Sequence, residues 1–133
     1  MNTIDATIKP VLLISGLITS TMLFAAIAPD AALQSMFGET VAGPLAALVV
    51  RNWAILVTLV GLALAYAAFR PAARNLVLVM ATLSKLAFIS LVLAYGFSKT
   101  AAGVSIAVDA AFVCVFLIYL VANFKRNSPK RYS

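Results

Sequence analysis

The chain has 133 residues, of which 64% are hydrophobic and 11% are charged, and its mean hydropathy is +1.07. A soluble domain carries about one-quarter charged residues and has a large surface to cover, so this composition excludes a soluble globular protein. The net charge of +6 does not indicate a nucleic-acid partner, because the basic residues flank apolar segments. We expect a single integral-membrane domain over residues 1–133, embedded in a lipid bilayer.

Four apolar runs follow one another, at residues 10–28, 45–69, 75–97 and 101–124. Each reaches or approaches the roughly 20 residues that a helix needs to cross about 30 Å of hydrocarbon. The runs are continuous and do not alternate as barrel strands do. The sequence therefore predicts an all-α fold of four transmembrane helices, and the short connections favour an up-down-up-down bundle.

The first run could be mistaken for a cleaved signal peptide, because Ala26-Ile27-Ala28 resembles a small-residue cleavage site. Its length and the proline directly after the site favour a retained helix. Residues 29–43 are then expected to form the external loop. Within it, Asp30 is expected to cap a short helix that Gly38 ends. That helix could lie on the membrane surface or be an ordinary connection.

The basic residues predict the orientation. Four spans place both termini on one side of the membrane. That side has seven cations, of which two are in the turn after the second run and four in a basic tail at 125–133. The seven are Lys9, Arg70, Arg74, Lys125, Arg126, Lys130 and Arg131. The opposite side has Lys99, together with Asp30 and Glu39. Since cytoplasmic loops are enriched in Lys and Arg, both termini are expected to be cytoplasmic.

Two features concern packing and the membrane interface. Small residues at spacings of three or four offer seams where helices can approach closely, and they occur on the second run (Gly61, Ala65, Ala68) and on the fourth (Gly103, Ala107, Ala111). Tyr66 and Tyr119 fall near the expected cytoplasmic interface, where aromatic side chains are common.

Three charges fall inside the apolar runs: Arg51, Lys85 and Asp109. A charge at bilayer depth is costly, so it usually faces the bundle interior and finds a partner. At 1.5 Å per residue, Arg51 lies ~10 Å, Asp109 ~12 Å and Lys85 ~18 Å from the outer end of its helix. An acid between two bases is the simplest arrangement, with Asp109 as the counter-ion of Lys85.

Polar side chains accompany these charges and complete the candidate site. Each lies beside a charge or at a comparable depth: Asn52 next to Arg51, Thr82 three residues before Lys85, Ser105 one turn before Asp109, and Thr19 on the first run with Ser15 one turn away. The cluster could form an outward-open pocket for a small anionic or lipid-like ligand. Alternatively, Lys85 and Asp109 are a structural ion pair, and Arg51 extends to the outer interface beside Trp53.

Two segments carry a resemblance to a known group. AALVVRNWAILVTLVGLALAYAAFR, followed by a basic turn and LVLVMATLSKLAFISLVLAYG, resembles small bacterial membrane proteins of the DoxX-like group. These have four helices and often an arginine early in the second, matched here by Arg51. The resemblance implies a bundle in the bacterial inner membrane, in some members an accessory subunit of sulfur or quinone redox metabolism.

The residues that redox chemistry would need are missing from the sequence. Cys114 is the single cysteine and histidine is absent, which excludes an internal disulfide, a CxxC pair, a cysteine zinc cluster and histidine-ligated haem. We therefore expect no cofactor, metal or catalytic residues, and no enzyme. The expected function is that of a non-catalytic accessory subunit that packs with another membrane protein or with itself. The alternative is binding or transport of a small anionic or amphipathic ligand.

Overall fold

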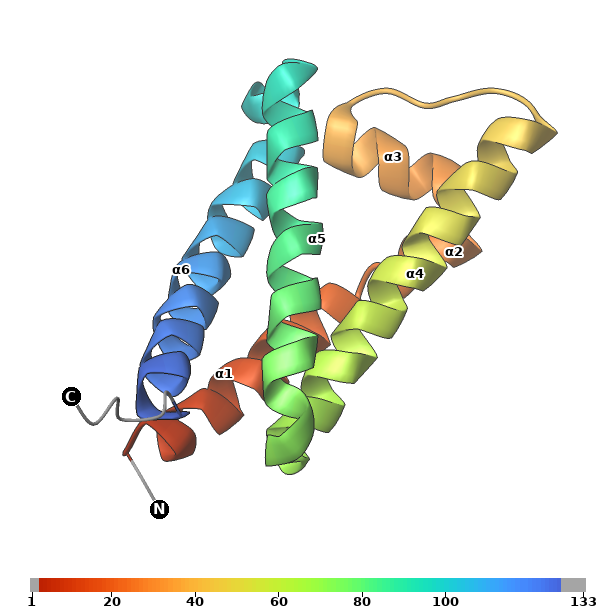
Figure 1. The fold of residues 1–133 in the computed structure, drawn as a ribbon. Coiled ribbons are helices and arrows are strands. Elements are labelled where there is room, and N and C mark those ends of the chain that lie inside the picture. The colour runs from red at the N-terminus through yellow and green to blue at the C-terminus, as the bar shows by residue number, and fades with distance from the viewer. Residues whose placement is uncertain (1–2, 128–133) are drawn as a thin grey trace.

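The computed structural model describes residues 3–127, with the side chains of residues 6–126. All regular structure in this part of the chain is helical: α1 (Thr3–Ser20), α2 (Leu23–Ile27), α3 (Pro29–Phe37), α4 (Pro44–Phe69), α5 (Arg74–Ala94) and α6 (Ala101–Asn127), with short 3₁₀ turns η1 (Pro71–Ala73) and η2 (Phe97–Lys99) (Figure 1). Four described segments are long and apolar enough to cross a membrane: Ala6–Ile27, Pro44–Phe69, Pro71–Ala94 and Ala101–Arg126. The prediction of an all-α protein with four candidate spans is confirmed.

The first predicted helix is interrupted, which the sequence did not indicate. α1 ends at Ser20 and α2 begins at Leu23. Between them the backbone N–H of Thr21 donates to Ile18, three residues back, and the Thr21 hydroxyl donates to the same carbonyl. Such tightening of the turn and side-chain bonding to the backbone are known causes of helix bends. The prediction of one continuous helix over 10–28 is therefore wrong.

The short helix expected after the first span is confirmed as α3. It ends at Gly38, whose φ of 74° is left-handed and whose N–H donates to the Gln34 carbonyl. Glycine adopts this conformation without a steric penalty. The predicted cap is wrong, because the N-cap residue is Ala28 and Asp30 lies inside the first turn. Pro29 supplies the first helical position, where its missing N–H costs nothing.

The remaining three helices follow the apolar runs closely. α4 starts one residue earlier than predicted. α5 ends at Ala94 because Gly96 turns into the left-handed region with a φ of 79°, which ends the helix before Phe97. α6 continues to Asn127, so the basic tail predicted from residue 125 begins as helix. Lys130 and Arg131 lie outside the described residues.

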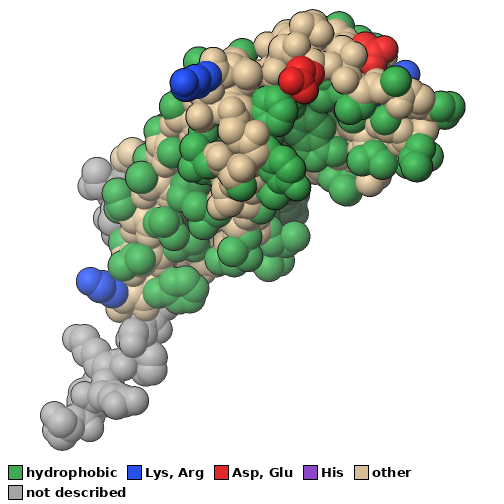
Figure 2. All heavy atoms as spheres, turned by 90° about the horizontal axis from the view of Figure 1, so that it is seen from above, with side chains coloured by type: hydrophobic (Ala, Val, Ile, Leu, Met, Phe, Trp, Pro, Cys, Tyr) green, Lys and Arg blue, Asp and Glu red, His purple; other side chains and the backbone are tan. Residues whose placement is uncertain are grey.

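Helices α4, α5 and α6 stand as three long rods, and α1 crosses them obliquely at the end where α6 finishes (Figure 1). α3 lies at the opposite end, beside the loop of residues 38–43. The helices leave many large apolar side chains exposed, and Figure 2 shows hydrophobic side chains over most of the face seen from the loop end. In a bilayer these side chains contact lipid rather than water.

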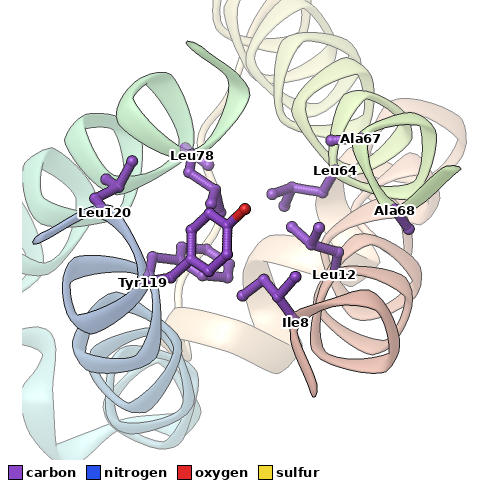
Figure 3. Packing of buried hydrophobic residues seen from close by; sticks show 10 residues of the cluster. Ile8, Leu12, Leu64, Ala67, Ala68, Leu78, Tyr119 and Leu120 are labelled. Atoms are coloured by element: carbon purple, nitrogen blue, oxygen red, sulfur yellow. The ribbon is translucent and has the colours of Figure 1, made fainter. Parts of the chain in front are cut away.

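The largest core cluster lies where α1 passes the other helices (Figure 3). Its ten buried members come from four helices: Ile8, Leu12, Leu64, Ala67, Ala68, Leu78, Ala81, Phe116, Tyr119 and Leu120. Tyr119 is 5% exposed and packs with the other members of this cluster. The expectation that it belongs to an interfacial belt is wrong, whereas Tyr66 is exposed as expected.

One of the two predicted small-residue seams is a helix contact. Gly61 and Ala65 on α4 pack directly against Gly16 on α1, so the two backbones nearly touch. In the second seam, Ala107 and Ala111 are exposed. Gly103 packs against the backbone carbonyl of Ser98, which lies in the turn that precedes α6. Within the described part of the chain, this second seam makes no close contact with another long helix. The partner residue Gly16 was not singled out from the sequence.

Candidate functional site: a buried ion pair and a polar layer

Lys85 and Asp109 form an ion pair inside the bundle. The Lys85 Nζ lies 2.6 Å from the Asp109 Oδ1, which joins α5 to α6. The Lys85 side chain is 7% exposed and that of Asp109 is 20% exposed. Each charge therefore has the partner that a buried charge requires. The structure brings together the two residues that the sequence proposed as counter-ions.

Thr19 extends the ion pair to a third helix. The Lys85 ammonium also donates to the Thr19 Oγ1 of α1 at 3.3 Å. The ring of Phe112 lies under the same nitrogen, with 5.9 Å between Nζ and the ring centroid. A lysine ammonium has three N–H donors and no acceptor. Two of the three donors are satisfied by Asp109 and Thr19, so this one side chain links α1, α5 and α6.

Two further hydroxyls lie about one turn before the two members of this contact, Ser15 before Thr19 on α1 and Thr82 before Lys85 on α5. Ser15 is 0% exposed and Thr82 is 4% exposed, and neither side-chain oxygen has a hydrogen-bond partner. Leaving a buried hydroxyl without a partner costs about 1–3 kcal/mol. Ser15, Thr19, Thr82, Lys85 and Asp109 are together called the polar layer here.

Ser105 lies on the same face of α6 as Asp109, because the two residues are four positions apart. It is half-buried, one turn before Asp109 on α6 and therefore nearer the end where the loop of residues 38–43 lies. The partial exposure of both residues contrasts with the buried Lys85 and Thr82. The polar layer is thus most exposed on its α6 side.

Arg51 does not join the polar layer. Its Nη1 donates to the Ala26 carbonyl at 2.9 Å, at the end of α2, and the side chain is exposed. This contact stabilises α2, because the last carbonyls of a helix have no partner within the helix. Asn52 is also exposed. The structure therefore separates Arg51 and Asn52 from the Lys85–Asp109 pair.

A shallow hollow of about 580 Å³ lies along the face of α4 that carries Arg51 and Asn52. Its other lining residues are apolar or nearly so: Pro44, Ala47, Leu48 and Ile55. The hollow combines a cation and an amide with an apolar stripe. Trp53 lies on another face of α4, half-buried and stacked on Phe88 of α5, with 6.2 Å between the ring centroids.

Arg74 is a polar contact that sequence reasoning missed. It is 5% exposed, and its Nε and Nη2 donate to the carbonyls of Ala67 and Ala68 at 2.9 and 2.8 Å. These carbonyls end α4, so the guanidinium closes the helix terminus. The sequence interpretation used Arg74 only as a topology signal. Its position a few residues beyond the end of an apolar run was the available indication of a cap.

A second missed contact joins α5 and α6 near the same end of the bundle. The side-chain amide of Asn123 donates to the Asn75 Oδ1 at 2.6 Å, and the Arg126 Nη2 donates to the Asn123 Oδ1 at 2.9 Å. Together with Lys85–Asp109, this contact fixes α5 against α6 at two levels.

The sequence matches no known family model, and neither a curated protein nor a solved structure is significantly similar to it. The polar layer and the Arg51 hollow are therefore the features from which a function is inferred.

Proposed function

We propose that the protein is a non-catalytic small membrane protein, an accessory or interaction subunit that packs against another membrane protein or a second copy of itself. The observation that carries this proposal is the Lys85–Asp109 pair, in which each charge satisfies the other and Lys85 also bonds to Thr19 of α1. Two of the three intramembrane charges are thus engaged in holding the helices together. The outer helix faces, rich in exposed apolar side chains, are the surface that remains for a partner.

The proposal includes an orientation. We place both termini in the cytoplasm and the loop of residues 38–43 outside, in an up-down-up-down arrangement. The excess of Lys and Arg at the end where α6 finishes supports this orientation. The bacterial inner membrane as location, and an accessory role there, rest on the resemblance to the DoxX-like group.

Native mass spectrometry of membranes tests the proposed function. The tagged full-length chain is released directly from membrane vesicles, so that weak contacts survive. The expected result is a complex with a second protein chain or a dimer. A monomer that carries no other chain, at expression levels close to natural abundance, would contradict the proposal.

A second candidate function is favoured by the Arg51 hollow. A guanidinium has five N–H donors, and Arg51 directs one of them to Ala26 while its side chain stays exposed. The apolar lining from Pro44 to Ile55 suits an acyl chain, and the cation suits a phosphate or carboxylate. In this alternative, the protein holds an anionic amphipathic ligand such as an acidic lipid.

Lipid retention tests this second candidate. The chain is placed in nanodiscs that contain equal amounts of phosphatidylglycerol and phosphatidylcholine, and bound lipid is counted by native mass spectrometry. Arg51→Gln is expected to lower the retained phosphatidylglycerol several-fold. The matched control Lys99→Gln removes an exposed cation in the turn between α5 and α6 and is expected to change nothing. Equal losses in both variants would show a general charge effect and contradict a site at Arg51.

A further inference from the structure

The four buried serine and threonine residues of the described chain behave in two different ways. Thr58 donates to the Ala54 carbonyl of its own helix at 2.7 Å, which is the usual arrangement for a hydroxyl inside a membrane helix. Ser15, Thr19 and Thr82 do not: Thr19 accepts from Lys85, and the other two have no partner. The three exceptions all belong to the polar layer, so their hydroxyls are available to a ligand there.

The two hydroxyls without a partner lie on the same side of the Lys85–Thr19 contact. Ser15 precedes Thr19 by one turn of α1, and Thr82 precedes Lys85 by about one turn of α5. Both helices begin at the same end of the bundle (Figure 1). The core residues Leu12 and Leu78 lie about one further turn toward that end. Ser15 and Thr82 therefore lie between the ion pair and the apolar core.

The chemistry of the groups around Ser15 and Thr82 indicates a neutral ligand. Lys85 and Asp109 cancel each other's charge, and Lys85 keeps one N–H donor beyond those directed at Asp109 and Thr19. The hydroxyls of Ser15 and Thr82 both donate and accept. Water fits this combination, because a buried water typically makes about three hydrogen bonds to polar groups that otherwise lack partners.

We propose that the polar layer binds water, bridging Ser15, Thr82 and the remaining N–H of Lys85. The water enters past Asp109 and Ser105, the two more exposed members of this region, from the end where the loop of residues 38–43 lies. The core around Leu12, Leu78 and Phe116, three side chains that offer water no polar group, closes the opposite end. The bundle thus contains an aqueous half-channel that stops within the membrane. This inference does not depend on whether the protein has a partner.

Cysteine accessibility tests the half-channel. Single-cysteine variants Ser15→Cys and Thr82→Cys are made with Cys114→Ala, since Cys114 is exposed. Ala81→Cys is the matched control, because Ala81 is next to Thr82, 0% exposed and part of the apolar core. A membrane-impermeant methanethiosulfonate is added to one membrane face at a time. It reacts with thiolates, which form only where water reaches the sulfur.

Both test variants are expected to react at least ~10-fold faster than Ala81→Cys, and only with reagent added on the side of the 38–43 loop. Rates equal to the control would show a dry layer and overturn the proposal. Reaction from the opposite face alone would overturn the assigned path.

Water-edited solid-state NMR of the unaltered chain in lipid bilayers keeps the proposal testable if the cysteine variants do not fold. Magnetisation from water is expected to reach Ser15 and Thr82 sooner than Leu78 and Ala81. Equal build-up at all four residues would overturn the proposal.

Discussion

Gly16 and Gly61 meet backbone to backbone where α1 crosses α4. A Cβ added to Gly16 would lie 2.6 Å from the Gly61 carbonyl oxygen, and one added to Gly61 would lie 2.8 Å from the Gly16 carbonyl oxygen. Real Cβ contacts are not this short, so neither helix accepts a side chain here without moving. Close approach through small residues is a main source of helix association in lipid, where no hydrophobic effect drives helices together.

Gly16→Val is expected to destabilise the fold by about 1–3 kcal/mol, because the added methyl groups meet backbone atoms that have no room to yield. Ala107→Val is the control, since it adds a similar side chain on an exposed face of α6. Thermal unfolding in detergent, followed by circular dichroism, measures both. A melting temperature that falls equally in the two variants would contradict the close crossing.

Removing one member of the ion pair is expected to be more harmful than removing both. Asp109→Leu leaves the Lys85 ammonium buried without its counter-ion, a change that costs about 3–5 kcal/mol in buried pairs. The double variant Lys85→Met with Asp109→Leu removes both charges and is expected to recover most of the lost stability. Chemical unfolding of four proteins, the unaltered chain, Asp109→Leu, Lys85→Met and the double variant, gives the coupling energy. Additive losses would show that the pair does not act as a unit.

Arg74→Gln is expected to lower stability by about 1.5–3 kcal/mol, since it removes charge-assisted hydrogen bonds to the end of α4. Arg70→Gln is a close control: it removes the same charge from the same turn, but Arg70 is exposed. Topology signals are therefore altered equally in the two variants. Unfolding temperatures and proteolysis at the turn distinguish them, and equal behaviour would show that the Arg74 contacts add nothing.

The proposed orientation predicts which turns face outward. In a Cys114→Ala background, Thr40→Cys is expected to react with a membrane-impermeant maleimide added to intact cells. Ala72→Cys, in the turn between α4 and α5, is expected to react only after the cells are opened. Both positions are exposed, so a difference in labelling reports the side of the membrane. The reverse pattern would contradict cytoplasmic termini.

Helix existence and the central ion pair could be read from the sequence because both follow from membrane energetics. A run of apolar residues must become a helix in lipid, and a buried lysine needs an acid at a similar depth. The break after Ser20 could not be read in this way, because it depends on where the Thr21 hydroxyl points. The direction of the Arg51 side chain could not be read from the sequence either. Its acceptor is a backbone carbonyl, and a residue of any type can provide one.

Contacts of different sequence separation also set an order of events during synthesis. Arg74 bonds to residues six and seven positions earlier, so these two contacts can form as soon as the turn between α4 and α5 leaves the ribosome. Lys85 precedes Asp109 by 24 residues and enters the translocon before its counter-ion has been made. The third span is therefore expected to wait at the insertion machinery for the fourth. Crosslinking to the translocon should show chains stalled before Asp109 retained there, and chains stalled well beyond it released.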